Sequence, residues 1–353
     1  MTILGIETSC DETGIALVRA NSQNTNITLL KNEVATSLAL HATTGGIIPE
    51  NAAREQLKVI LPVLKKVLKD MSPQKNIDAI SVTVGPGLIG SLLVGVETAK
   101  TLSYLWNKPL IPVNHLFGHI YANWLTEQNT SHIEKNLQPT SYTPRAITFP
   151  ALALVVSGNH TDLVLMQSHK DISVLGSTRD DAAGEAFDKI GRLLGLSYPA
   201  GPMISKLAEK GNEKAYNFPR PLMHSGDFDF SFSGLKTAVL REVKTIEHLD
   251  HATIENLCAS TQTAIVEVLV HKTLKAAKEH NIRSILLGGG VAANEKLRKV
   301  LTQKTNDELP MTNLFFPKKE FCTDNGAMIA AAAFFRKKTE NFEEIIVDPE
   351  LYY

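Results

Sequence analysis

Two histidines, His115 and His119, are the residues of this 353-residue sequence whose types and spacing point most clearly to chemistry. They stand in the run Asn-His-Leu-Phe-Gly-His, and side chains four residues apart lie on one face of a helix. Two imidazoles in that arrangement can bind one divalent metal ion. Spacing alone leaves open the alternative that both are ordinary core or surface histidines. No glutamate follows His115, so the general base of the His-Glu-x-x-His metalloproteases is missing.

Asp324 offers a third ligand for the same metal. It lies in the run Cys-Thr-Asp-Asn-Gly, directly before an apolar, alanine-rich segment. Two histidines and one carboxylate suit Fe(II) or Zn(II) and leave open positions for substrate oxygens. A carboxylate in this place also fits the N-cap of a helix, and the residues alone do not choose between the two roles.

Four glycine-bearing turns each follow a predicted strand. They span Ser9–Gly14, Gly85–Gly90, Ser157–Thr161 and Gly288–Asn294. Such turns present backbone N–H groups that bind anions, although glycine turns also arise for purely conformational reasons. Four of them at strand ends favour a nucleotide-type ligand. None is a P-loop, because no Gly-Lys-Ser/Thr follows a glycine run.

Three carboxylates, Asp181, Glu185 and Asp188, are spaced to form one stripe along a helix. A solvated helix face is the ordinary interpretation. Like charges stacked in this way repel one another, so a ligand hydroxyl or amine that faces the stripe is the alternative. A ribose diol accepted by Asp188 would fit.

The elements that must position these residues alternate between strands and helices. Two similar hairpins are expected, at 2–18 and 151–166, and they predict an internal duplication. Further strands are expected at 77–84, 110–113 and 284–287. Helices are expected at 54–69 (with Leu57, Ile60, Leu61, Leu64 and Leu68 at helical spacing), 91–106, 182–194, 325–335 and, as a long amphipathic helix, 254–278. Asn114 could cap the helix that carries both histidines. The alternation indicates an α/β fold whose sheets are covered by helices.

The composition indicates which class of protein this is, but it says little about the partners of the protein. The chain has 36 basic and 37 acidic side chains, so net charge neither indicates nor excludes a nucleic-acid partner. Three widely spaced cysteines predict reduced thiols in a cytoplasmic protein rather than a disulfide framework. No apolar run reaches the roughly 18 residues that a membrane span needs, and no signal peptide is apparent, so no membrane association is expected.

The motifs, taken in order along the chain, resemble those of the tRNA N6-adenosine threonylcarbamoyltransferase family, bacterial or organellar branch. Members of this family were once described as O-sialoglycoprotein endopeptidases. The resemblance extends from Gly5 to Gly326, nearly the whole chain. It is carried by Gly5–Gly14, His41–Arg54, Gly85–Gly90, Asn114–His119, Val155–Thr161, Ala182–Leu196, Phe230–Thr237, Gly288–Asn294 and Thr323–Gly326.

The resemblance implies the actin-like ATPase (ASKHA) fold, with two duplicated RNase H-like subdomains around a central cleft. The subdomains would span 1–130 and 131–324, and a C-terminal helix at about 325–353 would pack back on the first. The family implies one divalent metal ion per subunit, Fe²⁺ in preference to Zn²⁺, bound by His115, His119 and Asp324. It places an adenylate at Val155, Val156, Ser157, Gly158, Asn159, Asp188, Gly201 and Asn294.

The activity implied is acyl transfer from threonylcarbamoyl-AMP to N6 of the adenosine 3′ to the anticodon, in tRNAs that read codons beginning with A. Asp11 and Glu12 would lie at the reacting centre, and one of them would take the proton of the amine. The partners implied are tRNA and, in bacteria, a smaller paralogous dimer partner and a P-loop ATPase; organellar members form homodimers. The alternatives are an actin-fold small-molecule kinase and a non-enzymatic, nucleotide-dependent scaffold.

Several positions depart from the family pattern. Asn159 stands where glycine is usual, and asparagine is the residue that next best tolerates a positive φ. Ala53 and Gln56 replace the usual serine and histidine, which puts the role of that loop in doubt. Ala200 replaces a glycine. The segment 127–148 is longer than the family pattern predicts, and no role is assigned to it.

Overall fold

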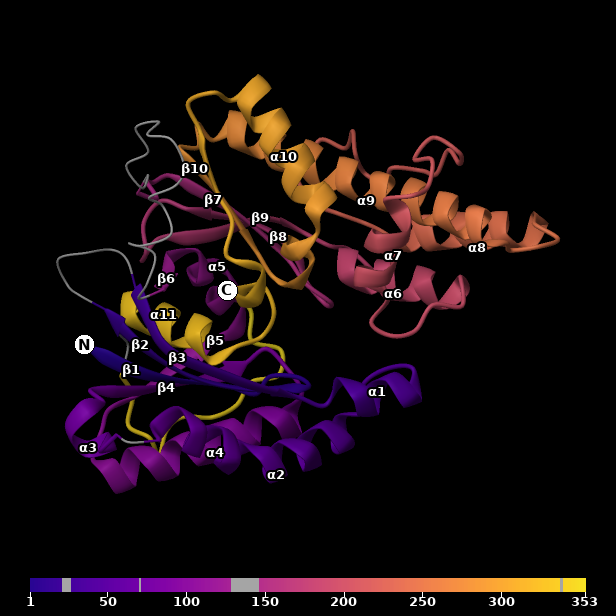
Figure 1. The fold of residues 1–353 in the computed structure, drawn as a ribbon. Coiled ribbons are helices and arrows are strands. Elements are labelled where there is room, and N and C mark those ends of the chain that lie inside the picture. The colour runs from indigo at the N-terminus through magenta and orange to yellow at the C-terminus, as the bar shows by residue number, and fades with distance from the viewer. Residues whose placement is uncertain (21–26, 70, 128–145, 337–338) are drawn as a thin grey trace, which may run out of the picture. The chain divides into compact units, whose positions relative to one another are not determined.

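The computed structural model describes residues 1–20, 27–69, 71–127, 146–336 and 339–353 (Figure 1). The chain forms two compact units. Unit 1 comprises Met1–Ala146 and Thr323–Tyr353, and unit 2 comprises Ile147–Cys322. The boundary predicted after residue 130 falls within 128–145, which lies outside the described residues. The boundary predicted after residue 324 differs from the observed one, because Asp324 leads directly into a helix that packs on the sheet of unit 1.

Unit 1 contains a six-stranded sheet in the order β5-β4-β1-β2-β3-β6. The strands are β1 (Thr2–Glu7), β2 (Glu12–Ala20), β3 (Ile27–Thr36), β4 (Ala79–Gly85), β5 (Leu110–Asn114) and β6 (Leu125–Glu127). Strands β1 and β2 form the predicted hairpin, and β3 continues antiparallel to β2. Strands β4 and β5 are parallel to β1, and β6 is parallel to β3.

The helices of unit 1 lie on both faces of this sheet (Figure 1). They are α1 (Leu38–Thr44), α2 (Pro49–Leu68), α3 (Pro73–Asn76), α4 (Ile89–Trp106), α5 (His115–Tyr121) and α11 (Gly326–Arg336), with a 3-10 turn at Ala122–Trp124. Alternate residues of β1 face opposite sides. Leu4 and Ile6 join the core formed with α2 and α4, whereas Gly5 packs against α11.

The helix predicted at 54–69 is confirmed as part of α2, whereas the expected length of the C-terminal helix was wrong. Ile60 and Leu64 of α2 are buried, but Leu57 and Leu61 are 64% and 55% exposed, so part of its apolar stripe faces away from the core. The C-terminal helix ends at Arg336 rather than near residue 353. The segment 339–353 instead follows the ends of β4 and β5 through backbone hydrogen bonds, such as the one from Asp348 N to Val84 O.

Unit 2 repeats the topology of unit 1. Its sheet has the order β11-β10-β7-β8-β9, with β7 (Ala151–Val156), β8 (Thr161–Met166), β9 (Ile172–Ser177), β10 (Ser284–Gly288) and β11 (Asn313–Phe315). The first three strands are antiparallel neighbours, and β10 and β11 are parallel to β7. The order and directions match β5-β4-β1-β2-β3, so the predicted duplication is confirmed.

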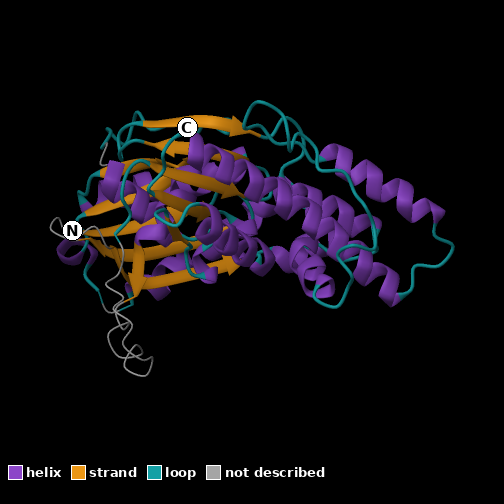
Figure 2. Cartoon of the chain, turned by 90° about the horizontal axis from the view of Figure 1, so that it is seen from above, coloured by secondary structure: helices purple, strands orange, loops and turns teal. Residues whose placement is uncertain are grey.

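The helices of unit 2 are α6 (Ala183–Leu193), α7 (Ala200–Ala208), α8 (Ser233–Thr245), α9 (His251–Glu279) and α10 (Glu295–Glu308), with 3-10 turns at Gly290–Ala293 and Lys319–Phe321. Helices and strands both contribute to each unit, as an α/β fold requires (Figure 2). The prediction of an amphipathic α9 was wrong. Between Leu257 and Ala277 only a narrow stripe at Glu267, His271 and Lys275 is partly exposed, because α7, α8, α10 and β7 pack around this helix.

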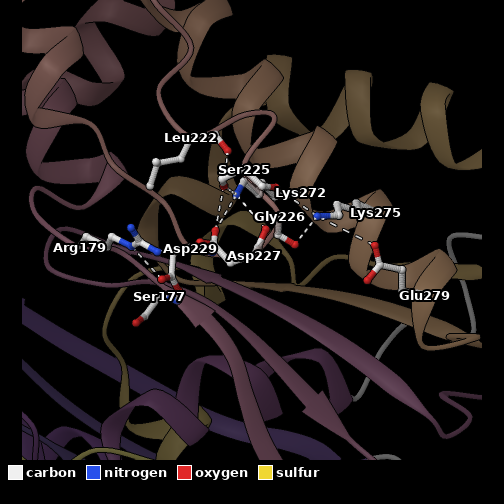
Figure 3. Close-up of polar contacts among 10 residues, drawn as sticks. All are labelled: Ser177, Arg179, Leu222, Ser225, Gly226, Asp227, Asp229, Lys272, Lys275 and Glu279. Atoms are coloured by element: carbon white, nitrogen blue, oxygen red, sulfur yellow. Dashed lines mark hydrogen bonds and ion pairs between the residues drawn. The ribbon is translucent and has the colours of Figure 1, made fainter.

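A buried lysine of α9 holds the segment 222–229 in place (Figure 3). Lys272 is 0% exposed, and its Nζ donates to Ser225 Oγ at 2.6 Å and to the carbonyl oxygen of Asp227 at 3.0 Å. Burial lowers the pKa of Lys272. The Asp227 carboxylate accepts from Ser225 and also pairs with Lys272, and these contacts lower the pKa of Asp227 to about 2. A buried cation thus finds partners within its own unit.

No helix among the described residues combines the length and the apolar character that a membrane crossing requires.

Candidate metal centre and glycine loops

The short helix α5 carries both histidines into the interior of unit 1. Asn114 caps it as predicted: Asn114 Oδ1 accepts from Leu116 N at 2.8 Å. The amide nitrogen of Asn114 donates to the carbonyl oxygen of Tyr352 at 3.1 Å, which ties the C-terminal segment to the start of α5. His115 is 8% exposed and His119 is 1% exposed. The capped helix therefore places both imidazoles inside the protein, with ring centroids 4.6 Å apart.

Asp324 reaches the same point from the opposite end of the sequence. Asp324 Oδ1 lies 3.6 Å from His115 Nε2 and 3.4 Å from His119 Nε2. One ligand atom from each of the three residues lies within 4.8 Å of the others. Asn325, and not Asp324, caps α11, because Asn325 Oδ1 accepts from Met328 N at 3.0 Å. The alternative role considered for Asp324 is thereby removed, and its carboxylate faces the histidines.

Close backbone packing between α11 and the sheet allows Asp324 to approach the two histidines. An added Cβ at Gly5 would lie 2.0 Å from the Gly326 carbonyl oxygen, and one at Gly326 would lie 2.5 Å from Ala16 N. Contacts that short exclude a side chain at Gly5 or at Gly326. The backbone of α11 can therefore lie directly against β1 and β2. The first turn of α11, directly after Asp324, is held against the sheet in this way.

Glu7, which the sequence analysis missed, completes the surroundings of His115. Its carboxylate is fully buried at the end of β1 and lies 3.2 Å from His115 Nδ1. It also accepts from Ser9 N at 2.6 Å and from the hydroxyl of Thr83. An acceptor at Nδ1 keeps a proton there, so the proton that a metal would displace is the one on Nε2, the nitrogen that faces Asp324. The sequence held one signal for this role: Glu7 is a charged residue at the end of the otherwise apolar strand β1.

Carboxylates crowd this site. Burial raises the pKa of Glu12 to about 10, and the charges of Asp324 and Asp11 add to that effect. Burial also raises the pKa of Asp324 to about 6, although the charge of His115 opposes the shift. Burial lowers the pKa of His115, but the charges of Asp324 and Glu7 outweigh it and raise that pKa to about 9. A buried excess of negative charge beside two imidazoles fits a divalent cation, which would offset the mutual repulsion of the carboxylates.

The predicted adenylate loops gather at one end of the sheet of unit 2. Val155 and Val156 are buried at the end of β7, and the turn that begins at Ser157 is closed by a hydrogen bond from Ser157 N to the His160 carbonyl. Gly184 at the start of α6 donates to the Ser157 carbonyl at 3.2 Å. Gly289, with φ +91°, lies so close to Val156 that an added Cβ would be 2.3 Å from its carbonyl oxygen. Two of the four glycine-bearing turns and the start of α6 therefore meet here, with Gly158 and Asn159 exposed.

The remaining predicted residues of unit 2 surround α7. Asp188 Oδ1 accepts from Ala200 N at 2.7 Å and from Gly201 N at 3.4 Å, and burial raises the pKa of Asp188. Asn294 caps α10, and its amide nitrogen donates to Ser205 Oγ at 2.7 Å and to Gln262 Oε1 at 2.8 Å. Both side chains thus link α7 to its neighbours.

The predicted stripe of three carboxylates is only partly helical, because Asp181 precedes α6, and two of its charges are balanced from within the chain. Lys189 Nζ lies 2.6 Å from Asp181 Oδ1 and 2.8 Å from Glu185 Oε1. The repulsion that suggested a ligand amine is therefore offset by a lysine, and only Asp188 of the three retains a place in the predicted adenylate site.

Comparison with known proteins agrees with this architecture. The family model described as tRNA N6-adenosine threonylcarbamoyltransferase matches residues 28–331. The protein of that name from Thermosipho melanesiensis is 49% identical over 335 residues, which cover 95% of this chain and 94% of that protein. The one from Syntrophomonas wolfei is 44% identical over 341 residues, covering 96% and 94%.

A solved structure extends the comparison to the fold. HypF from T. kodakarensis superposes with a TM-score of 0.58 at 15% identity, covering 95% of this chain and 47% of HypF. The chain thus corresponds to about half of HypF, and the likeness concerns the fold alone. The predicted actin-like ATPase fold is confirmed. By sequence, the chain belongs to the tRNA N6-adenosine threonylcarbamoyltransferase family.

Proposed function

We propose that this protein transfers the threonylcarbamoyl group from threonylcarbamoyl-AMP to N6 of the adenosine 3′ to the anticodon, in tRNAs that read codons beginning with A. The exocyclic amine attacks the carbamoyl carbon, the bond from that carbon to the phosphate oxygen breaks, and AMP leaves with the electron pair. The observation that carries the proposal is the buried cluster of His115, His119 and Asp324 in a chain 49% identical to a protein of that name.

His115, His119 and Asp324 would hold one divalent ion per subunit, Fe²⁺ in preference to Zn²⁺. When bound, the ion supplies Lewis-acid polarisation of substrate oxygens. The protein's own part is to orient the ligands: Glu7 accepts the Nδ1 proton of His115, and Asn114 fixes the start of α5. The Glu-x-x-His base of the metalloproteases is absent, so the centre is suited to position an acyl group rather than to activate water.

Asp11 is the proposed acceptor of the proton that the attacking amine loses. Its side chain is 8% exposed and is hydrogen-bonded to Glu12. With a pKa raised to about 10, Glu12 carries a proton at neutral pH and can donate a hydrogen bond rather than take a proton. A hydrogen bond from Glu12 would orient the Asp11 carboxylate toward the attacking amine, as a general base requires.

The adenylate would bind to unit 2. In the turn at Ser157, Gly158 and Asn159, the exposed Gly158 and Asn159 offer backbone N–H groups for its phosphate, beside the buried Val155 and Val156, while Ser157 N closes the turn on His160. Asp188 uses Oδ1 to hold the start of α7 at Gly201, so a ribose hydroxyl would be accepted at Oδ2. Asn294 would act by holding α7 and α10 together, since its amide is bonded to Ser205 and Gln262.

A partner subunit would dock on the outer face of α2 and α4. Four large apolar residues are exposed there at i, i+4 spacing: Leu57 at 64%, Leu61 at 55%, Ile89 at 58% and Leu93 at 43%. Helices α2 and α4 approach closely, since an added Cβ on Gly90 would lie 3.2 Å from Ala53 Cβ. We propose that a smaller paralogue covers this face in a bacterial protein, together with a P-loop ATPase in the assembly, and that a second copy covers it in an organellar one.

The reaction would take place in the cytoplasm. Its tRNA substrate is found there, and Cys10, Cys258 and Cys322 are all free thiols, as a reducing compartment favours.

Nucleoside mass spectrometry tests the proposed activity. Purified protein is incubated with threonine, bicarbonate, ATP, the adenylate-forming enzyme, the dimer partner where one is required, and unmodified tRNA. The threonylcarbamoyl mass should appear on adenosine with wild-type protein and be lost with His115→Ala. Glu247→Gln, an exposed change between α8 and α9, serves as the control. Full activity of His115→Ala would refute the metal's role, and steady ATP-dependent phosphorylation of a small acceptor would favour a kinase instead.

A further inference from the structure

Gln56 of α2 makes an unusual set of contacts with the segment Thr8–Glu12. The side chain is 1% exposed, and its amide nitrogen donates to the carbonyl oxygens of Thr8 at 3.3 Å, Cys10 at 3.1 Å and Glu12 at 2.9 Å. One side chain therefore binds every second carbonyl along the turn that joins β1 to β2. This turn carries Asp11 and Glu12.

The two intervening carbonyls of the turn are bound from other elements. The Ser9 carbonyl accepts from Leu88 N at 2.8 Å, and the Asp11 carbonyl accepts from Ser37 Oγ at 2.9 Å. Ser91 Oγ adds a second donor to the Cys10 carbonyl at 3.0 Å. All five carbonyl oxygens from Thr8 to Glu12 thus have a partner outside the turn, and Gln56 is the residue that spans both of its ends.

We infer that Gln56 is a positioning residue: it holds the Thr8–Glu12 turn so that the side chains of Asp11 and Glu12 face the cluster of His115, His119 and Asp324. The inference rests on the proposed function, in which Asp11 takes the proton of the amine. The amide has one workable orientation, because a flipped group would set Oε1 against three carbonyl oxygens. The donor –NH₂ group must therefore face the turn.

The nature of the side chain at position 56 decides how well the turn is held. Glutamine brings two hydrogens to three acceptors. The histidine that is usual at this position would bring one ring N–H toward them, and methionine, of similar length, would bring none. A small displacement of a catalytic group costs rate rather than binding, so the effect should appear in kcat.

The experiment compares Gln56→Met and Gln56→His with the wild type, and uses Lys66→Met on the exposed face of the same helix as the control. The measurements are kcat and the KM for tRNA, together with bound metal by elemental analysis. We expect Gln56→Met to lower kcat about 100-fold with an unchanged KM. Gln56→His should restore kcat to within about 10-fold of wild type, since one donor returns. Bound metal and the activity of Lys66→Met should stay at wild-type levels.

A wild-type kcat in Gln56→Met would overturn the inference, and so would a loss of bound metal equal to the loss of rate. If Gln56→Met does not fold, Gln56→Asn, whose amide is one methylene too short to span the turn, replaces it with the same readings. Hydrogen exchange of the Thr8–Glu12 amides needs no substrate, and it should be faster in the variant. Failure of the wild type to modify tRNA would count against the proposed function, whereas unchanged exchange would count against the role of Gln56.

Discussion

Replacement of Glu7 by glutamine tests the proposed metal centre, because it changes the hydrogen-bond partner of His115 without removing a proposed ligand. The carboxylate of Glu7 accepts from Ser9 N, from Thr83 and from His115 Nδ1. In Glu7→Gln the new amide oxygen can keep the bond from Ser9, which leaves the –NH₂ group facing Thr83 and His115. Two donors cannot face each other, so His115 either turns its Nδ1 proton to the neutral Ser9 Oγ, 3.2 Å away, or carries its proton on Nε2 instead. Nε2 is the atom that points at Asp324.

The size of the effect follows from burial. Loss of the partner behind a metal-bound histidine costs about 10- to 100-fold in metal affinity, which is about 1.4–2.8 kcal/mol. Glu7 is 0% exposed, so water has no access to replace the lost carboxylate, and the acceptor that remains near Nδ1, the hydroxyl of Ser9, carries no charge. We therefore expect the upper end of that range, about 100-fold weaker binding.

The assay is a competition titration of metal-free protein with Zn²⁺ or, without oxygen, Fe²⁺, against a chelator of known affinity. Glu97→Gln removes an exposed carboxylate and should bind like wild type. Glu7→Gln should also lower the pKa of His115. In the metal-free protein, burial lowers this pKa, but the charges of Asp324 and Glu7 outweigh burial and raise it to about 9. An imidazole NMR titration measures this. Wild-type affinity in a folded Glu7→Gln variant would refute the reasoning.

Three further outcomes are expected. Because His115, with its pKa of about 9, is protonated at pH 7.5, metal binding should release about one proton per site, and less as pH rises through 9; calorimetry in two buffers of different ionisation enthalpy measures this. Gly326→Ala would place a Cβ 2.5 Å from a backbone nitrogen of β2 and should lower the free energy of unfolding by about 3 kcal/mol in urea, whereas Gly226→Ala, with open space around it, should not. Lys272→Met should lower the melting temperature at pH 7. The pKa of Asp227 is lowered to about 2, so its pairing with Lys272 should stabilise the wild type above pH 4 and cease to do so as pH falls through 2. Thermal unfolding of both proteins at several pH values tests this, because the difference in melting temperature should shrink at low pH.

The duplicated fold could be read from the sequence because its signals are local. The strands of both hairpins are short apolar runs on either side of a polar turn, and the structure contains them at the predicted places. The long helix α9 could not be read correctly in the same way. Its periodicity suggested one apolar face, but whether Ser260, Thr261 or Lys272 face solvent depends on the helices that surround it.

The ligand cluster could be predicted in part for a similar reason. His115 and His119 are four residues apart, and helix geometry alone brings them together. Asp324 was proposed from residue type, but its approach depends on glycine contacts between β1, β2 and α11 that no local pattern encodes. Metal binding by the three residues stays a prediction. The metal affinity of Glu7→Gln and the number of protons released on metal binding test it independently.

Glu7 and Gln56 were missed because their roles are defined by distant partners. Each is a polar residue among apolar or charged neighbours, and burial of such a group requires partners within the protein. For Glu7 the partner is 108 residues away along the chain, and for Gln56 the nearest partner in sequence, Glu12, is 44 residues away. A buried polar residue predicted at the end of a strand should therefore be treated as a candidate for the functional site.

The internal duplication also bears on how the two units divide the work. The turn between β1 and β2 and the turn between β7 and β8 are topological equivalents, since each joins the first two strands of the same sheet order. In unit 1 the turn carries Asp11, which Glu12 follows, and Gln56 holds its backbone. In unit 2 the equivalent turn is Ser-Gly-Asn-His, with no carboxylate between Val156 and Thr161. Carboxylate chemistry at that point is therefore open to unit 1 alone, whereas the turn of unit 2, which is exposed at Gly158 and Asn159 and ends in His160, is suited to bind a phosphate.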